Sequence, residues 1–162
     1  MKINVFGLKA GEKVPFAFAV PAAPYNAFLA DGEFKSEIKV TGEVTLAGDG
    51  YLVSGLIKCR KAFVCDRCLE PTEVEQTHPF AEKYRQDGVA DDEDAVPFTG
   101  ETIDLAEMVR DTLIAAQPIG NLCREDCLGL CPKCGQNLNQ GSCSCVIEDI
   151  DPRLADLKQL LI

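Results

Sequence analysis

The sequence predicts an α+β protein: an antiparallel β-sheet that could be barrel-like, one packed helix, and a Cys-rich, zinc-binding C-terminal module. Three observations support this: alternating polar and apolar residues from Ser36 onward, an apolar stripe at helical spacing within 103–116, and six cysteines from Cys123 to Cys145. The 162 residues are 46% hydrophobic and 26% charged, which suffices for a hydrophobic core. We predict a mainly β domain over 1–118 and a zinc module with a C-terminal helix over 119–162.

The β-strands are predicted from two-residue periodicity and from turn residues. After an opening strand and an irregular, proline-rich stretch, the apolar residues Ile38, Val40, Val44 and Leu46 alternate with polar ones, as in a half-buried strand. A glycine-rich turn at 47–50 then leads into further strands, which we place at 51–59, 61–65 and 72–84. Short connections between these segments indicate an antiparallel meander.

Two helices are predicted after the strands. Asp104 with Glu107 three residues later has the spacing of a capping box at a helix start. The helix covers about 103–116, and its apolar stripe comprises Leu105, Met108, Val109, Thr112, Leu113 and Ala116. Asp151 followed by Pro152 predicts the start of a second, C-terminal helix.

The charge balance restricts the classes of partner. Sixteen Lys and Arg against 26 Asp and Glu give a formal net charge of −10, which repels a phosphate backbone and favours a basic protein partner. A local basic patch remains a candidate nucleic-acid contact, formed by Lys58, Arg60, Lys61 and Arg67. Such a basic edge could equally protect a strand from pairing with another chain.

No membrane segment or export signal is recognisable. The sequence lacks an apolar run of about 18 residues, so we expect no membrane span. Its first residues lack the apolar block of a signal peptide, so we expect a cytoplasmic, reducing location. In that setting clustered cysteines are typical of metal sites rather than disulfides.

The first cysteine pair is Cys65-x2-Cys68, between two predicted strands. Two thiolates at this spacing can face a common centre and supply half of a tetrahedral zinc site. A redox dithiol uses the same spacing, but usually where a strand opens into a helix, whereas Pro71 and a β-like continuation follow here. We favour the metal interpretation and keep redox chemistry as the alternative.

The remaining cluster carries the stronger metal signal. Its run Cys131-Pro132-Lys133-Cys134-Gly135 has the form of a zinc knuckle. Setting Cys59 aside leaves eight cysteines, the number that two four-ligand zinc sites require. We favour one site made of Cys131, Cys134, Cys143 and Cys145 and a second made of Cys65, Cys68, Cys123 and Cys127. A rival partition groups Cys123, Cys127, Cys131 and Cys134.

All-cysteine ligation points to a structural role for the metal. Four thiolates leave no open position for water, so such zinc ions hold the fold together and activate no nucleophile. The sequence shows no catalytic triad, phosphate loop or paired-carboxylate signature, and His78 is its one histidine. We therefore expect neither an enzyme nor a small-molecule substrate.

Several motifs together resemble the bacterial YceD family. They are Cys65-Asp66-Arg67-Cys68-Leu69, the start of the helix at Ile103-Asp104-Leu105, the run from Leu122 to Gly135, Asn137-Leu138-Asn139, and Asp151-Pro152-Arg153-Leu154. The resemblance covers about 36–161. It implies a non-enzymatic cytoplasmic protein that is needed for accumulation of large-subunit (23S) ribosomal RNA.

The leading functional hypothesis is thus a ribosome-biogenesis factor with structural zinc. Its partner would be a large-subunit ribosomal precursor, which it would contact through a ribosomal protein or through rRNA. The alternative is a thiol redox or zinc-sensing protein that uses Cys65 and Cys68. Sequence-specific DNA binding is the weakest hypothesis, because no basic recognition helix is present.

Overall fold

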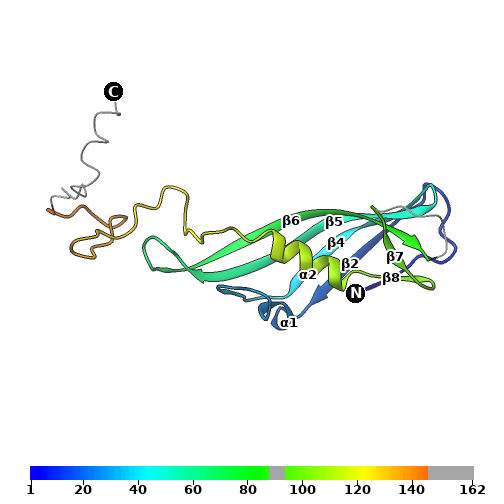
Figure 1. Ribbon diagram of the computed structural model, residues 1–162, viewed down its shortest axis with the longest axis horizontal. Coiled ribbons are helices and arrows are strands. Elements are labelled where there is room, and N and C mark those ends of the chain that lie inside the picture. The colour runs from blue at the N-terminus through cyan, green and yellow to red at the C-terminus, as the bar shows by residue number, and fades with distance from the viewer. Residues whose placement is uncertain (88–93, 146–162) are drawn as a thin grey trace, which may run out of the picture.

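A computed structural model describes residues 1–87 and 94–145 of the chain (Figure 1). Its centre is a curved, six-stranded sheet with the order β2-β4-β5-β6-β7, in which β3 also pairs with β5. The strands are β2 (Lys13–Val20), β3 (Glu33–Phe34), β4 (Ile38–Ala47), β5 (Gly50–Val64), β6 (Pro71–Gln86) and β7 (Val96–Phe98). Every pairing in this sheet is antiparallel except that between β6 and β7.

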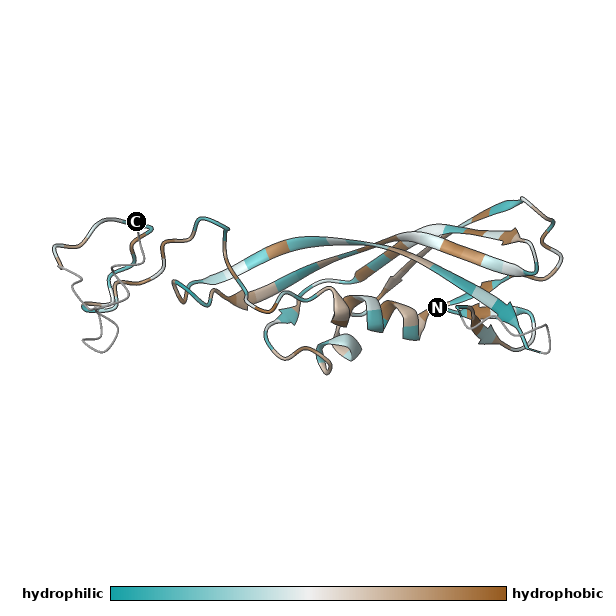
Figure 2. Cartoon of the chain, turned by 45° about the horizontal axis from the view of Figure 1, so that its top comes forward, coloured by the Kyte–Doolittle hydropathy of each residue, from teal (hydrophilic) through white to brown (hydrophobic). Residues whose placement is uncertain are grey.

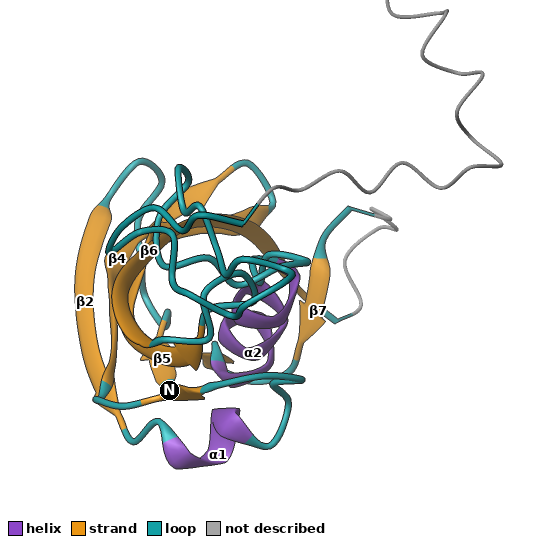
Figure 3. Cartoon of the chain, turned by 90° about the vertical axis from the view of Figure 1, so that its left-hand side faces the viewer, coloured by secondary structure: helices purple, strands orange, loops and turns teal. Residues whose placement is uncertain are grey.

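The remaining elements cover this sheet. Strands β1 (Lys2–Asn4) and β8 (Thr102–Asp104) pair with each other as a separate two-stranded sheet, and α1 (Ala23–Asn26) is a single helical turn. Helix α2 (Ala106–Ala115) lies inside the curve of the large sheet, as Figure 3 shows in the view along the strands. No helix among the described residues has the length and apolar character needed to cross a bilayer.

Alternating hydrophobicity explains why the long strands form. On β5 the buried residues Val53, Ile57 and Cys59 face the core, while Leu52 and Leu56 lie on the opposite, outer face. Figure 2 shows the resulting bands of hydrophobic and hydrophilic residues along the strands. The β5–β6 ladder runs from Tyr51, opposite Tyr84, to Val64, opposite Pro71, and so carries a long hairpin out to one end of the sheet.

Two facing glycines permit close packing between β4 and β5. Gly42 of β4 lies opposite Gly55 of β5. A Cβ atom would lie 2.2 Å from the Ser54 carbonyl oxygen at Gly42, and 2.1 Å from the Thr41 oxygen at Gly55. Since real Cβ atoms do not approach a carbonyl so closely, these positions require glycine for the observed strand geometry.

Helix α2 closes the core through one apolar face. Its backbone begins after Asp104, whose Oδ1 accepts a hydrogen bond from the Ala106 N–H at 3.0 Å. Val109 and Leu113 are the buried residues of the helix and pack with the core residues of the sheet. The buried core also includes Ile3, Val5, Ile38, Val40, Val44, Val53, Ile57, Phe80, Tyr84, Ile103 and Leu105.

Leu113→Ala is expected to lower the free energy of unfolding by about 2–5 kcal/mol, because it leaves a cavity beneath the sheet. The neighbouring Ile114 is 41% exposed, so Ile114→Ala should lower it by less than about 1.5 kcal/mol. Urea denaturation of both variants provides the measurement. An equal decrease in the free energy of unfolding in the two variants would contradict the placement of α2.

Three sequence expectations need correction, and a fourth cannot be compared with the structure. The sheet is not closed into a barrel: β2 and β7 end the strand order, and no pairing joins them in the described ranges. The strands expected at 51–59 and 61–65 are one strand, because Arg60 continues the ladder opposite Glu75. The helix is shorter than 103–116, since Thr102–Asp104 pairs with β1, and Leu105 rather than Asp104 occupies its N-cap position. The helix expected at Asp151 lies outside the described residues.

Candidate metal centres

Four cysteines from distant parts of the sequence meet at the tip of the β5–β6 hairpin. Cys65 and Cys68 lie in the turn of the hairpin, and Cys123 and Cys127 lie in the segment that follows α2. All four sulfur atoms lie within 4.8 Å of one another. We call this group the hairpin site. Three of its cysteines are buried and Cys123 is half-buried.

The sulfur spacing of the hairpin site suits tetrahedral zinc. The Sγ atoms of Cys65 and Cys127 are 3.9 Å apart, and those of Cys68 and Cys123 are 3.7 Å apart. A zinc ion with Zn–S bonds of about 2.3 Å places its ligands about 3.8 Å from one another. A disulfide would require about 2.05 Å, so the geometry fits metal ligation and not oxidised pairs.

The second group lies farther along the chain. The Sγ atoms of Cys131, Cys134, Cys143 and Cys145 also lie within 4.8 Å of one another. We call this group the distal site. Cys131 is buried, Cys143 and Cys145 are half-buried, and Cys134 is exposed. The distal site is therefore more open to solvent than the hairpin site.

Both sites start from the same backbone turn. In the hairpin site the N–H of Leu69 donates to the Cys65 carbonyl at 2.9 Å, and the Cys65 N–H donates to the carbonyl of Glu70 at 3.0 Å. In the distal site the N–H of Gly135 donates to the Cys131 carbonyl at 2.8 Å, and the Cys131 N–H donates to that of Gln136 at 2.8 Å. Each Cys-x2-Cys pair is thus held by a knuckle that aims both sulfurs to one side.

Hydrogen bonds hold the segment after α2 against the hairpin independently of sulfur. Asn121 and Asp66 exchange two bonds: the Asp66 N–H donates to the Asn121 carbonyl at 2.8 Å, and the Asn121 N–H donates to Asp66 Oδ2 at 2.6 Å. The buried Lys61 Nζ donates to Asn121 Oδ1 at 2.9 Å. These contacts bring Cys123 to the hairpin site.

The thiols of each group resist full ionisation on their own. The backbone N–H of Cys68 lowers the pKa of Cys65 to about 6, whereas burial and the neighbouring thiols raise that of Cys123 to about 12. Backbone N–H donors likewise lower the pKa of Cys131 to about 6, and the Cys134 side chain and burial raise that of Cys145 to about 12. A divalent cation would supply the positive charge that four clustered thiolates need.

Asn139 supports the hairpin site from outside. Its Nδ2 lies 3.3 Å from the Cys127 sulfur, and its Oδ1 accepts bonds from the Leu128 N–H and from the Arg124 guanidinium at 2.8 Å each. A donor to a ligating sulfur orients that ligand and stabilises the charge of its thiolate.

Asn139→Ala is expected to weaken zinc binding at the hairpin site by about 10–100-fold, because it removes this sulfur contact and the bond that fixes Leu128. Gln140→Ala is the matched control, because the adjacent Gln140 donates its side-chain hydrogen bond to Glu70 Oε1 instead of to a sulfur. Competition with a chromophoric zinc chelator measures both affinities. Equal affinity in the two variants would rule out a supporting role for Asn139.

The four basic residues considered for nucleic-acid contact do not share one surface. Lys61 is 2% exposed and points into the protein. Lys58 and Arg60 are exposed, and Arg60 pairs with Glu75 at 2.7 Å. Arg67 donates to the Cys127 carbonyl at 3.0 Å, which fixes it beside the hairpin site.

Comparison with known proteins places the chain in a family. The family described as "Large ribosomal RNA subunit accumulation protein YceD" matches residues 53–161, a range that contains both cysteine groups. An uncharacterized protein of Mycobacterium tuberculosis is 35% identical over 123 residues, 73% of this chain and 59% of that protein. An uncharacterized protein of Mycobacterium leprae is 30% identical over 142 residues, 84% of this chain and 65% of that protein. This chain therefore spans about three-fifths of the length of these relatives.

A plant relative carries the family name. The chloroplastic "Large ribosomal RNA subunit accumulation protein YCED homolog 1" of Arabidopsis thaliana is 36% identical over 76 residues, 46% of this chain and 24% of that protein. No solved structure matches the chain. The family match over two-thirds of the chain confirms the resemblance noted in the sequence: the chain belongs to the YceD family.

Proposed function

We propose that this chain is a non-enzymatic ribosome-biogenesis factor that supports accumulation of large-subunit rRNA, with a structural zinc ion in each cysteine group. The observation that carries the proposal is the family match over residues 53–161, which includes every cysteine of both groups. The family is named for large-subunit rRNA accumulation. The closed, four-thiol geometry favours a structural rather than a catalytic metal.

The zinc ions would shape one end of the molecule. A zinc ion in the hairpin site would link the tip of the β5–β6 hairpin to the segment after α2, so that it fixes two parts of the chain that are 55–62 residues apart. Structural zinc contributes on the order of 10–16 kcal/mol of apparent binding free energy in small domains. The Cys-rich segment continues beyond this end of the sheet (Figure 1).

The charge of the chain favours a protein component of the ribosomal precursor as its direct partner. The net charge is −10, and two zinc ions that each bind four thiolates would change it to −14. Ribosomal proteins that contact rRNA are strongly basic, so they complement an acidic surface. Contact with rRNA through the exposed residues Lys58 and Arg60 would add to this interaction.

Co-sedimentation of the tagged chain with large-subunit precursors tests the proposal. In sucrose gradients of a lysate of its source organism, the chain should migrate with these precursors. Its depletion should reduce large-subunit rRNA relative to small-subunit rRNA. Absence from the precursor fractions at every salt concentration, together with an unchanged rRNA ratio, would overturn the assignment.

The thiol redox or zinc-sensing alternative receives less support from the geometry. A redox-active thiolate must be reachable by its partner, whereas Cys65 is 0% and Cys68 is 3% exposed. Two further sulfurs lie beside them, which is the arrangement of a metal site rather than of an isolated dithiol.

A further inference from the structure

A groove of about 860 Å³ lies next to the hairpin site. One wall is the segment 31–35, and the other is the end of the β5–β6 hairpin. Strand β5 extends past its pairing with β3, which stops at Ala62, so that Phe63 and Val64 border the groove without a strand on that side in the described part of the chain. The groove thus lies along an open strand edge, where an extended segment can be accommodated.

Apolar side chains line part of this groove. Val64 is 55% exposed and Leu69 is 62% exposed, while Phe63 is largely buried. Burying these two large exposed hydrophobic side chains of the groove under a partner would remove their unfavourable contact with water.

Leu69 has an unusual backbone conformation for a leucine. Its φ is +59°, and it is the one non-glycine residue with positive φ among the residues that the structure describes. The equivalent position of the distal knuckle is Gly135, with φ +74°, which adopts this conformation without strain. The fold would therefore accept glycine at position 69, so the leucine side chain is not explained by the knuckle itself.

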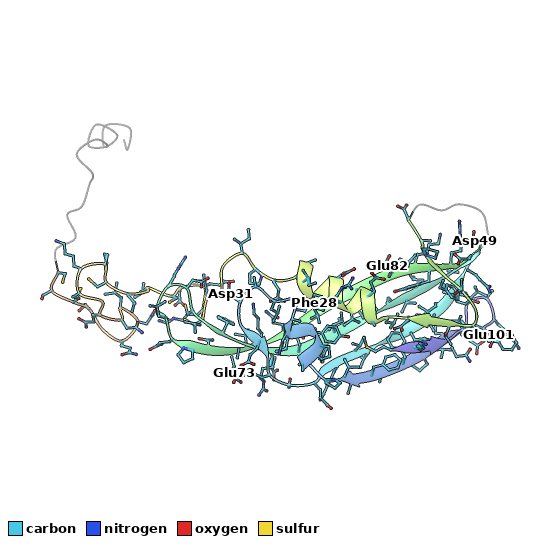
Figure 4. The ribbon with its side chains drawn as sticks, turned by 60° about the horizontal axis from the view of Figure 1, so that its bottom comes forward. Phe28, Asp31, Asp49, Glu73, Glu82 and Glu101 are labelled. Atoms are coloured by element: carbon cyan, nitrogen blue, oxygen red, sulfur yellow. The ribbon has the colours of Figure 1, made fainter. Side chains whose placement is uncertain are left out.

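The lining of the groove has more carboxylates than cations, and the buried Lys61 also interacts with two of these carboxylates, Asp31 and Asp66. Asp31, Glu33, Asp66 and Glu73 contribute four carboxylates, and Lys35 is the single cation in the lining, where it donates to Glu33. Asp66 is also engaged by the Asn121 N–H. Figure 4 labels Asp31 and Glu73 at the end of the sheet that lies beside the Cys-rich segment.

We propose that this groove binds an extended basic protein segment, rich in lysine and arginine, that inserts an apolar side chain against Leu69 and Val64. This inference rests on the proposed function, because it assigns the surface that would meet a basic ribosomal protein. The four carboxylates complement cationic side chains and repel the phosphates of RNA. The exposed apolar residues supply the contact that holds one segment in place.

Fluorescence anisotropy with the zinc-loaded full chain tests this directly. The probe is a short fluorescein-labelled peptide of alternating lysine and arginine with a central leucine. Its controls are the same peptide with the leucine replaced by serine and a single-stranded RNA. The wild-type chain should bind the leucine peptide most tightly and the RNA most weakly. Preference for the RNA would contradict a groove that binds basic protein segments.

Leu69→Gly is the key variant because it removes the side chain and relieves the backbone. It should weaken binding of the leucine peptide about tenfold, while zinc content stays unchanged and the melting temperature stays equal or rises by up to about 3 °C. Leu69→Asn, which also tolerates positive φ, should weaken binding similarly. Unchanged peptide affinity in both variants would overturn the proposal.

A charge-matched pair of double variants tests the carboxylates. Asp31→Asn with Glu73→Gln should weaken peptide binding about five- to tenfold at low ionic strength, and less at high salt. Glu82→Gln with Glu101→Gln removes the same charge toward the other end of the sheet and should have little effect (Figure 4). An equal loss of peptide affinity in the two double variants would mean that peptide binding depends on the net charge of the chain and not on this groove.

The experiments can contradict the groove proposal and the proposed role in ribosome biogenesis independently of each other. If the wild-type chain co-sediments with large-subunit precursors but none of the groove variants alters peptide binding, the groove assignment is wrong and the proposed function stands. If Leu69→Gly weakens peptide binding as expected but the chain does not co-sediment with these precursors, the groove assignment is supported and the proposed function is wrong.

Discussion

Replacing Cys65 and Cys68 with serine is expected to remove one zinc ion per chain and to release the segment that follows α2 from the sheet. These two thiols supply half of the hairpin site, and a serine hydroxyl is a poor zinc ligand. Because structural zinc contributes on the order of 10–16 kcal/mol of apparent binding free energy, the bonds at Asn121 cannot replace it. Zinc content by elemental analysis and limited proteolysis at 119–145 measure the two effects.

The same substitution at Cys59 provides the control. Cys59 is buried on β5, its sulfur lies 3.9 Å from Gln76 Oε1, and it belongs to neither cysteine group. Cys59→Ser should retain both zinc ions and resist proteolysis like the wild type. The sheet should remain folded in all variants, since the main hydrophobic core contains none of the eight grouped cysteines. Protection of 119–145 in the zinc-deficient double variant would contradict the role of the hairpin site.

Zinc is expected to leave the distal site first when a chelator is added. Cys134 is exposed and two other distal thiols are half-buried, whereas Cys65, Cys68 and Cys127 are at most 3% exposed. A chelator or an alkylating reagent must reach the sulfur or the metal, so access sets the order of loss. Release should therefore occur in two phases. Alkylation during the first phase should label the distal cysteines of the sequence 131–145.

The hairpin site should lose its metal in the slow phase, together with the docking of the segment after α2. A Cys143→Ser and Cys145→Ser variant supplies the control, because it lacks half of the distal site and should show the slow phase alone. Mass spectrometry of the alkylated protein identifies which thiols react at each time. Labelling of Cys65 and Cys68 before Cys134 would reverse the predicted order and would favour the thiol redox hypothesis.

The strands of the sheet were predictable because their signal is local. Residues such as Ile38, Val40 and Val44 alternate along the chain, and that alternation alone predicts which face is buried. Closure of the sheet is not a local property. It depends on whether the edge strands β2 and β7 pair with each other. No pattern in the sequence of either strand predicts how far apart the two strands lie.

The break predicted near Arg60 had a different cause. The sequence pattern predicts one strand that ends at Cys59 and a next one that starts at Lys61, and it assigns Lys58, Arg60 and Lys61 to a basic patch, whereas the ladder continues through all of them. The two-residue period from Ile57 through Cys59 to Lys61 gives the signal that could have placed Lys61 on the inner face. The buried ammonium group of Lys61 is stabilised by a hydrogen bond to Asn121, which lies 60 residues farther along the chain, so its burial could not be predicted from neighbouring residues.

The metal-ligand candidates followed from cysteine spacing, but their supporting residues did not. Asn121 and Asn139 act through hydrogen bonds to residues distant in the sequence, which include Lys61 and Asp66 for Asn121 and the Cys127 sulfur for Asn139. A lone asparagine near cysteines has no periodicity and no fixed spacing from its partner. Long-range contacts of this kind emerge only when the chain is folded.

Elemental analysis of freshly reduced, zinc-supplemented and gel-filtered protein is the most direct test of the structural metal sites. The two cysteine groups predict two zinc ions per folded chain, one of which is lost in the Cys65→Ser and Cys68→Ser variant. A folded, fully reduced wild-type chain that retains no zinc after this treatment would contradict the account.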